Sequence, residues 1–476
     1  MKRFIRGSDR NQRVLFPVSL DESISENNPV RVIDAFVEGL DLKHQGFDGV
    51  TPSRTGRAGY HPSTLLKLYI YGYLNWVQSS RRLERECQRN VELMWLLGEL
   101  APDHKTISEF RRKYGAAITQ VNAAFVQVCR RLGLLSTQTV AIDGSKFKAV
   151  NNRDKNFTPE KMKYRQARVE KSIAKYLAAL EKADREAVSL PAAETERLQA
   201  RLAKLHEEMQ RLEALKVQMD AAPDRQLSLT DADARSMKCR GGGTVGYNVQ
   251  TAVDSEHHLI VAHEVINTGI DRGQLSGMAI KAKEALHTER LEVVADRGYF
   301  EGEQLRACQT QQITAYVPRP QTSSNLAKGW YGKRDFIYKP EDDEYECPAG
   351  ERLIYRFSRQ ERGKLIHRYW SSACTRCTIK TKCTTGQYRR VSRWEHEATL
   401  DEVEARLQSA PEKMQLRRQT VEHPFGTIKA WMGATHFLTR GFGQVRTEMS
   451  LNVLAYNLKR VINLLGVGAV LETLRA

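Results

Sequence analysis

The chain has 476 residues, and its 41% hydrophobic content is enough for at least one large core and roughly two to four domains. Lysine and arginine number 74 against 57 acidic residues, and the resulting formal charge of +17 favours a polyanionic partner such as nucleic acid. No apolar run of about eighteen residues and no signal peptide is present, so we expect a cytoplasmic protein without a membrane partner. Eight cysteines are too few for a disulfide scaffold.

Residues 1–135 are predicted to form a helical domain, because apolar residues recur at helical spacing between short polar breaks. Either Asp103 or Thr106 can cap a helix near the middle of this region. That helix carries three successive cations, Arg111, Arg112 and Lys113. Two interpretations stay open: a helix-turn-helix domain that places this helix on DNA, and a plain bundle with solvated cations. The net charge favours DNA binding.

A mixed α/β core is predicted for residues 136–158 and 224–320. Its first strand, VAIDGSKFKAV, delivers Asp143 to a turn that contains glycine, and two alternating segments later form a hairpin. A helix then leads into the apolar run LEVVADRGYF, which delivers Asp296. Between the two parts of the core, residues 159–223 carry two heptad-like tracks separated by Pro191. They predict an antiparallel coiled-coil hairpin, with pairing between two chains as the alternative.

Residues 321–400 form a second insert, which is rich in cysteine and basic residues. Four cysteines follow the spacing Cys347-x26-Cys374-x2-Cys377-x5-Cys383. Short cysteine turns of this kind suit tetrahedral Zn²⁺, so this insert is a candidate zinc ribbon. A reduced cluster without metal is the alternative.

The C-terminal helices, residues 401–476, include the stretch QLRRQTVEHPFGTIKAW. Arg418, Glu422 and Lys429 are spaced so that they can share one side of a helix, and Pro424 is expected to kink that helix or to start a new one. Taken alone, this pattern is also that of a surface helix with ion pairs.

Asp143 and Asp296 both follow apolar strands, at the end of an α/β sheet where side chains converge on a crevice. Two carboxylates in such a place need cations, and Mg²⁺ takes oxygen ligands. A third carboxylate would complete a site for two metal ions that acts on a phosphodiester, and Glu422 is the candidate.

These residues resemble the DDE transposases of bacterial insertion sequences, whose catalytic domain is RNase H-like. In that family the first aspartate lies on the first strand and is usually followed by glycine, as in Asp143-Gly144, and the second lies on the fourth strand. The glutamate belongs to a Tyr-x2-Arg-x3-Glu-x6-Lys signature, which is matched here at Arg418, Glu422 and Lys429. The position of the tyrosine is taken by Gln415.

The resemblance implies an RNase H-like mixed sheet with flanking helices, preceded by an all-helical DNA-binding domain. It implies a transposase that uses Mg²⁺ (or Mn²⁺) at Asp143, Asp296 and Glu422 to hydrolyse a phosphodiester at the transposon end. The freed 3′ hydroxyl then attacks target DNA, with Arg418 and Lys429 on DNA phosphate. We expect double-stranded DNA as partner, a homodimer or higher oligomer on DNA, and association with the nucleoid. Two other readings stay open: a DNA-binding protein derived from a transposase, and a nuclease of the same fold without strand transfer.

Overall fold

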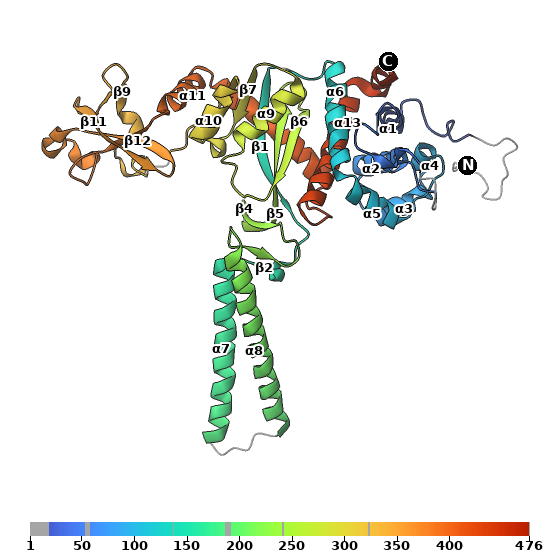
Figure 1. Cartoon of the computed structure of the whole chain (residues 1–476), viewed down its shortest axis with the longest axis horizontal. Coiled ribbons are helices and arrows are strands. Elements are labelled where there is room, and N and C mark those ends of the chain that lie inside the picture. Colours follow the sequence, from blue (N-terminus) through green and yellow to red (C-terminus); the bar gives the residue numbers. More distant parts are fainter. Residues whose placement is uncertain are drawn as a thin grey trace, which may run out of the picture.

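A mixed six-stranded sheet lies at the centre of the computed structural model (Figure 1). The structure describes residues 19–52, 58–136, 138–185, 192–239, 242–321 and 324–475. The central strands follow the order β4-β5-β1-β7-β8, and β6 lies outside this order and also pairs with β5. Their bounds are β1 Thr139–Lys148, β4 Arg235–Cys239, β5 Gly242–Asp254, β6 Ile260–Ile266, β7 Leu291–Ala295 and β8 Ile313–Tyr316.

Strand direction changes at β1, which is antiparallel to β5 and parallel to β7. In the parallel pair Ile142 lies opposite Ala295, so the residues that follow them, Asp143 within β1 and Asp296 just after β7, are neighbours. One face of the sheet packs against α9 (Leu275–Leu286) and α10 (Gly302–Thr310), and the other packs against α12 (Glu412–Gly426). The sheet is therefore a layer between helices, as the sequence predicts for a mixed α/β core.

Six helices form the N-terminal domain and pack around the long C-terminal helix α13 (Phe442–Arg475). Asp103 caps α5, because its side chain accepts hydrogen bonds from the backbone N–H groups of Lys105 (2.8 Å) and Thr106 (3.0 Å). Of the two predicted caps, Asp103 is thus the correct one. The six helices are α1 Pro29–Glu38, α2 Pro62–Leu74, α3 Ser80–Cys87, α4 Val91–Leu97, α5 His104–Lys113 and α6 Gly115–Arg131.

Helix α13 is, within the described ranges, the one helix long and apolar enough to cross a membrane. Half of its most apolar window is buried inside the protein, where it contacts α1, α2, α6 and β6. This is the environment of a core helix that joins the N-terminal domain to the sheet. The regular helical geometry of α13 is interrupted at Gly466, whose φ of 78° is accessible to glycine at little cost.

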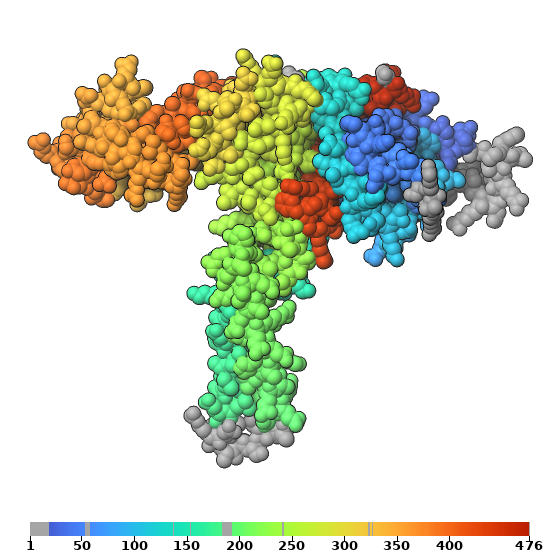
Figure 2. Space-filling model, in the orientation of Figure 1, coloured from blue at the N-terminus to red at the C-terminus, as the bar shows by residue number. Residues whose placement is uncertain are grey.

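Two long helices, α7 (Pro159–Arg185) and α8 (Ala192–Ala221), lie side by side and project from the body of the protein (Figures 1 and 2). We call this pair the helical arm. Its base holds an apolar cluster and a two-stranded sheet of β2 (Asn156–Phe157) and β3 (Leu227–Ser228). The helices pair within one chain, and the predicted turn at Pro191 lies outside the described residues.

The Cys-rich insert contains a second, five-stranded antiparallel sheet in the order β13-β12-β11-β10-β9. It lies at the opposite end of the molecule from the N-terminal domain (Figure 1). The bounds are β9 Ile337–Lys339, β10 Glu344–Glu346, β11 Arg352–Glu361, β12 Lys364–Trp370 and β13 Val391–Trp394, with 3₁₀ turns at Leu326–Lys328, Lys333–Asp335, Ser372–Arg376 and Lys380–Lys382.

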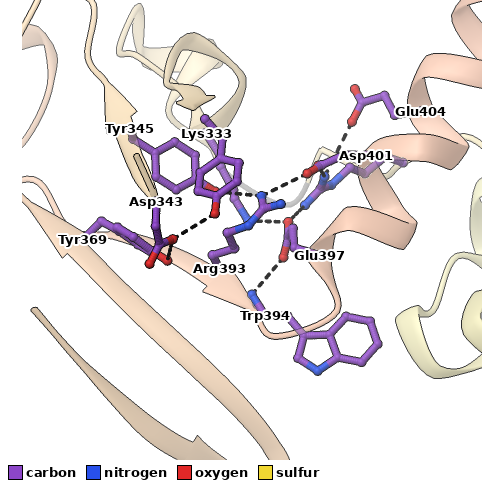
Figure 3. A network of polar contacts seen from close by, with 11 residues as sticks. Lys333, Asp343, Tyr345, Tyr369, Arg393, Trp394, Glu397, Asp401 and Glu404 are labelled. Carbon is purple, nitrogen blue, oxygen red and sulfur yellow. Dashed lines mark hydrogen bonds and ion pairs between the residues drawn. The ribbon is translucent and has the colours of Figure 1, made fainter. Parts of the chain in front are cut away.

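A polar junction attaches this insert to the core through α11 (Glu397–Ser409) (Figure 3). Glu397 has only 4% of its surface exposed and accepts hydrogen bonds from Arg319, from Lys333 Nζ (2.5 Å) and from the backbone N–H of Trp394 (3.0 Å). Burial alone would raise the pKa of Glu397, but the two cations outweigh it and hold the pKa below its ordinary value. The junction fixes the direction in which the insert leaves the core.

Helix α12 contains Pro424 without a break, contrary to the predicted kink. The regular helix continues to Gly426, and a π-helical turn, Thr427–Trp431, follows. Proline removes one donor and crowds the preceding turn, and here the helix widens just after it instead of ending. Lys429 lies within the π turn, which alters the angular relation to Glu422 that a regular helix would give.

We predict that Glu397→Gln destabilises the insert, because in a partly desolvated site Lys333 loses its acidic partner and Arg319, which keeps Asp401 and Glu404, loses its closest one. The expected loss is about 2 kcal/mol in the free energy of unfolding, less than for a fully buried pair because Lys333 keeps contact with water. Thermal or urea unfolding measures it. Glu402→Gln, on the exposed side of the same helix, is the control. Equal stability of the two variants would contradict the role of the junction.

Candidate active site

Asp143, in the middle of strand β1, lies next to Asp296, the first residue after strand β7. Ala141 lies two residues before Asp143, and Val294 lies two residues before Asp296. Both apolar side chains pack against Val421 of α12. Since side chains two residues apart in an extended strand share a face, both carboxylates lie on the side of the sheet that α12 covers. The two aspartates that the sequence singles out thus come together beneath one helix.

Arg417 of α12 contacts both carboxylates. Its Nη2 donates a hydrogen bond to Asp143 Oδ1 (2.7 Å) and lies 3.9 Å from Asp296 Oδ2. The Arg417 side chain is 17% exposed, the Asp143 side chain 23% and the Asp296 side chain 44%. The sequence signature pointed instead to the neighbouring Arg418, which is exposed on α12.

The site is rich in negative charge. Burial raises the pKa of Asp143 to about 6; Arg417 and the amide of Gly144 oppose this shift, whereas Asp296 and Asp271 add to it. A carboxyl group in this condition gains from a nearby cation, since the cation stabilises its ionised form. The hard oxygen donors of Asp143 and Asp296 fit a divalent cation such as Mg²⁺.

Asp271 is a third carboxylate at this end of the sheet, and no sequence motif singles it out. It lies in the loop after β6, and its Oδ1 accepts hydrogen bonds from Asn248 Nδ2 and Gln250 Nε2, both at 2.8 Å. The hydroxyl of Tyr299 in turn donates to Gln250 Oε1. Asp271 is therefore held by buried amides beside the two aspartates.

Gly144 makes room for this arrangement. A Cβ at this position would lie 2.3 Å from Gln250 Nε2 and 2.5 Å from Asp271 Oδ1, well inside van der Waals contact. Steric crowding therefore explains why glycine follows Asp143 in this chain: no side chain fits between β1 and the amides that hold Asp271.

Glu422 lies on the exposed surface of α12 and makes no hydrogen bond or ion pair within the described part of the chain. It follows Arg417 by five residues, which places the two side chains about 140° apart around a regular helix. With Arg417 facing the aspartates, Glu422 faces away from them. In the described ranges no three His, Cys, Asp or Glu side chains are grouped closely enough to hold a metal ion.

Lys429 links the end of α12 to strand β1. Its Nζ donates to Ser145 Oγ (2.6 Å) and to the carbonyl oxygen of Lys146 (2.9 Å), and it lies 4.4 Å from the ring centroid of Phe147. Burial lowers the pKa of Lys429. In this structure the predicted phosphate-binding lysine is thus engaged with the protein itself, whereas Arg418 is exposed and makes no ion pair with any described residue.

The three cations of α5 differ in orientation. Arg111 points into the N-terminal domain, where its Nη1 donates to the hydroxyl of Tyr73 (3.2 Å) and its guanidinium lies 5.5 Å from the ring centroid of Tyr69. These contacts engage the half-buried Arg111 with the domain itself, and its assignment to a DNA-binding surface stays a prediction. Arg112 and Lys113 are exposed and pair with Glu109 (2.5 Å) and Asp48 (2.9 Å).

The four cysteines of the insert are free thiols that lie near one another. Cys347 and Cys383 belong to one apolar cluster; Cys374 lies within the adjacent 3₁₀ turn, Ser372–Arg376, and Cys377 directly follows it. Burial raises the pKa of Cys383, Arg389 lowers it, and the other three cysteines raise it further. Four thiols gathered in this way suit a soft metal ion such as Zn²⁺, although they are not arranged as a closed site here.

We predict that Gly144→Ala destabilises the protein by about 1–3 kcal/mol, because the added methyl group would overpack the contact with Gln250 and Asp271. Gly277→Ala is the matched control: position 277 lies within α9, and nothing lies within 4 Å of a Cβ there. Alanine at this helical position is expected to be neutral or stabilising. Chemical unfolding of both variants measures the difference, and equal stabilities would contradict the steric role of Gly144.

Comparison with known proteins gives matches at both ends of the chain. A model described as "Transposase domain (DUF772)" matches residues 18–113, and a model described as "Transposase DDE domain" matches residues 346–462. The second match includes Arg418, Glu422 and Lys429. It begins after Asp143 and Asp296 in the sequence and does not include them. No curated protein matches the chain.

A search of solved structures found a likeness to a cryo-EM structure of a piggyBac transposase synaptic complex with hairpin DNA. It covers 94% of this chain and 79% of that one, at 8% identity and a TM-score of 0.30. A likeness this weak carries no argument about fold or mechanism. The two family matches, one with each end of the chain, identify it as a DDE transposase of the insertion-sequence type.

Proposed function

We propose that the chain cleaves DNA at the ends of its insertion sequence and joins the freed 3′ end to target DNA. The observation that supports this most directly is the pair Asp143 and Asp296, which neighbouring strands bring to one cation, Arg417. Carboxylates grouped in this way beneath a helix are suited to a metal-dependent reaction at phosphate.

The strand order supports an RNase H-like catalytic domain. If the short edge strand β4 is set aside, β1 and β7 are the first and fourth strands of the central sheet along the chain. They carry the two aspartates, as the resemblance to DDE transposases implies. We further propose that the N-terminal helices bind DNA through the exposed Arg112 and Lys113, and that the helical arm and the Cys-rich insert are additions to this core.

Asp143 and Asp296 would hold Mg²⁺ or Mn²⁺, and Glu422 would be the third ligand, from the helix that covers them. When bound, the metal ions would activate the attacking oxygen and stabilise the leaving one. Glu422 is available for this role because it is exposed and has no partner among the described residues. Arg418 is one helical turn away and would bind a phosphate of the DNA backbone, which would position the strand without reading its sequence.

We predict that Asp143→Asn, Asp296→Asn and Glu422→Gln each abolish cleavage of DNA that carries the ends of the element. Each change removes one negative charge and one oxygen ligand with little change in shape. Cleavage in Mg²⁺ and a gel-shift assay with the same DNA measure activity and binding separately, and binding is expected to persist. Glu412→Gln, at the exposed start of α12, is the control for Glu422.

Normal cleavage by one of these variants would remove that residue from the site, and normal cleavage by all three would contradict the proposed function. A DNA substrate with a pre-cut end separates the alternatives. A transposase joins this end to target DNA, a nuclease of the same fold does not, and a DNA-binding protein derived from a transposase neither cuts nor joins.

We also propose that Cys347, Cys374, Cys377 and Cys383 bind one structural Zn²⁺. Support comes from the four thiols that gather beside a small apolar cluster, which by itself is a limited core for a five-stranded sheet. We predict about one equivalent of zinc per chain after removal of loosely bound ions, and its loss in Cys374→Ser together with a lower melting temperature of the insert. Cys239→Ser, an exposed cysteine outside the insert, is the control. Folded protein without zinc would refute the site.

A further inference from the structure

The contacts of Arg417 with the two aspartates are incomplete. It is hydrogen-bonded to Asp143 but only approaches Asp296, at 3.9 Å, and its buried Nε has no hydrogen-bond partner among the residues that the structure describes. A buried donor without a partner is costly, so this guanidinium is not in a fully satisfied site. Asp296, with 44% of its side chain exposed, leaves the site open to solvent on one side.

The charge at this site is only partly balanced. Arg417 supplies one positive charge to Asp143 and Asp296, and Asp271 lies close enough to raise the pKa of Asp143 further. Asp271 also receives hydrogen bonds from two neutral amides, which leave its charge in place. A divalent ion carries twice the charge of a guanidinium in a smaller volume and would neutralise the pair better.

We propose that Arg417 is the resident cation of the metal-free site: it neutralises Asp143 and Asp296 until a divalent metal ion displaces it. Arg417 therefore stabilises the protein without metal and competes with metal binding. This inference rests on the proposed function, since it assumes that the two aspartates are the metal ligands. It assigns to Arg417 a positioning role distinct from that of its neighbour Arg418.

The geometry of α12 connects this exchange to Glu422. Arg417 and Glu422 lie about 140° apart around the helix, so only one of them can face the aspartates in a given orientation. The structure has Arg417 inward and Glu422 outward. Release of Arg417 removes one of the contacts that hold α12 in this orientation, beside the ion pair of Lys413 with Glu292, and the π turn at Thr427–Trp431 is a place where the helix can adjust.

The test compares Arg417→Gln with Arg418→Gln, which removes the same charge one residue away on the exposed surface. Mn²⁺ affinity is measured by titration calorimetry or electron paramagnetic resonance at pH 8, and the melting temperature is measured in EDTA. We expect Arg417→Gln to bind Mn²⁺ roughly tenfold more tightly than the unchanged protein, a factor that corresponds to about 1.4 kcal/mol. Its melting temperature in EDTA should be lower, and Arg418→Gln should match the unchanged protein in both measurements.

Equal or weaker Mn²⁺ binding by Arg417→Gln would overturn the proposal. If this variant does not fold in EDTA, Arg417→Lys serves instead: its compact ammonium cannot span both carboxylates, so its Mn²⁺ affinity should exceed that of the unchanged protein. Asp143→Asn identifies the cause of a failure. If it binds Mn²⁺ as well as the unchanged protein, the metal is elsewhere and the proposed function fails as well. If it does not bind Mn²⁺ while Arg417→Gln is unchanged, only the role of Arg417 is refuted.

Discussion

The mutual repulsion of carboxylates at the end of the central sheet is the constraint on which the candidate site depends. Two parallel strands bring Asp143 and Asp296 together, and the ionised pair is stable there only when a cation neutralises it. In this structure the cation comes from α12, which is also the helix that buries the same face of the sheet through Val421. Packing and charge balance are thus supplied by one element, and the position of α12 decides which side chain meets the aspartates.

The parts around the core set the position of that helix. The Cys-rich insert separates β8 from α11 and α12 in the sequence, and the polar junction around Glu397 brings the chain back to the core. At the other end, Lys429 fastens the end of α12 to β1, and α13 then runs into the N-terminal domain. An insert that is large in sequence is accommodated because both of its ends are fixed beside the sheet.

The sequence predicted the strands, the helical arm and the two aspartates because each has a local signal, such as an apolar run that ends in Asp296. It did not reveal Asp271, because this residue lies in a loop without periodicity and gains meaning only when Gln250 and Gly144 are beside it. It selected Arg418 over Arg417 because spacing along a chain does not say which side of a helix packs inward.

Arg111 shows the same limit, since the ring that buries it comes from a helix some forty residues earlier. Pro424 illustrates another: a proline is a strong local signal against a regular helix, yet packing of Val421 and Phe425 on either side of it keeps α12 continuous. Local rules locate such residues but do not determine the outcome where tertiary contacts outweigh them.

The order of synthesis follows from the separation of these residues along the chain. Asp143 and Arg417 are 274 residues apart, and α12 emerges from the ribosome after the core strands, the arm and the insert. At common elongation rates of 5–20 residues per second, this interval lasts roughly 15 to 55 seconds. In the last part of that interval, after Asp296 has been made, the nascent chain carries both aspartates without the helix that covers them, so the site takes shape only when the chain is almost complete.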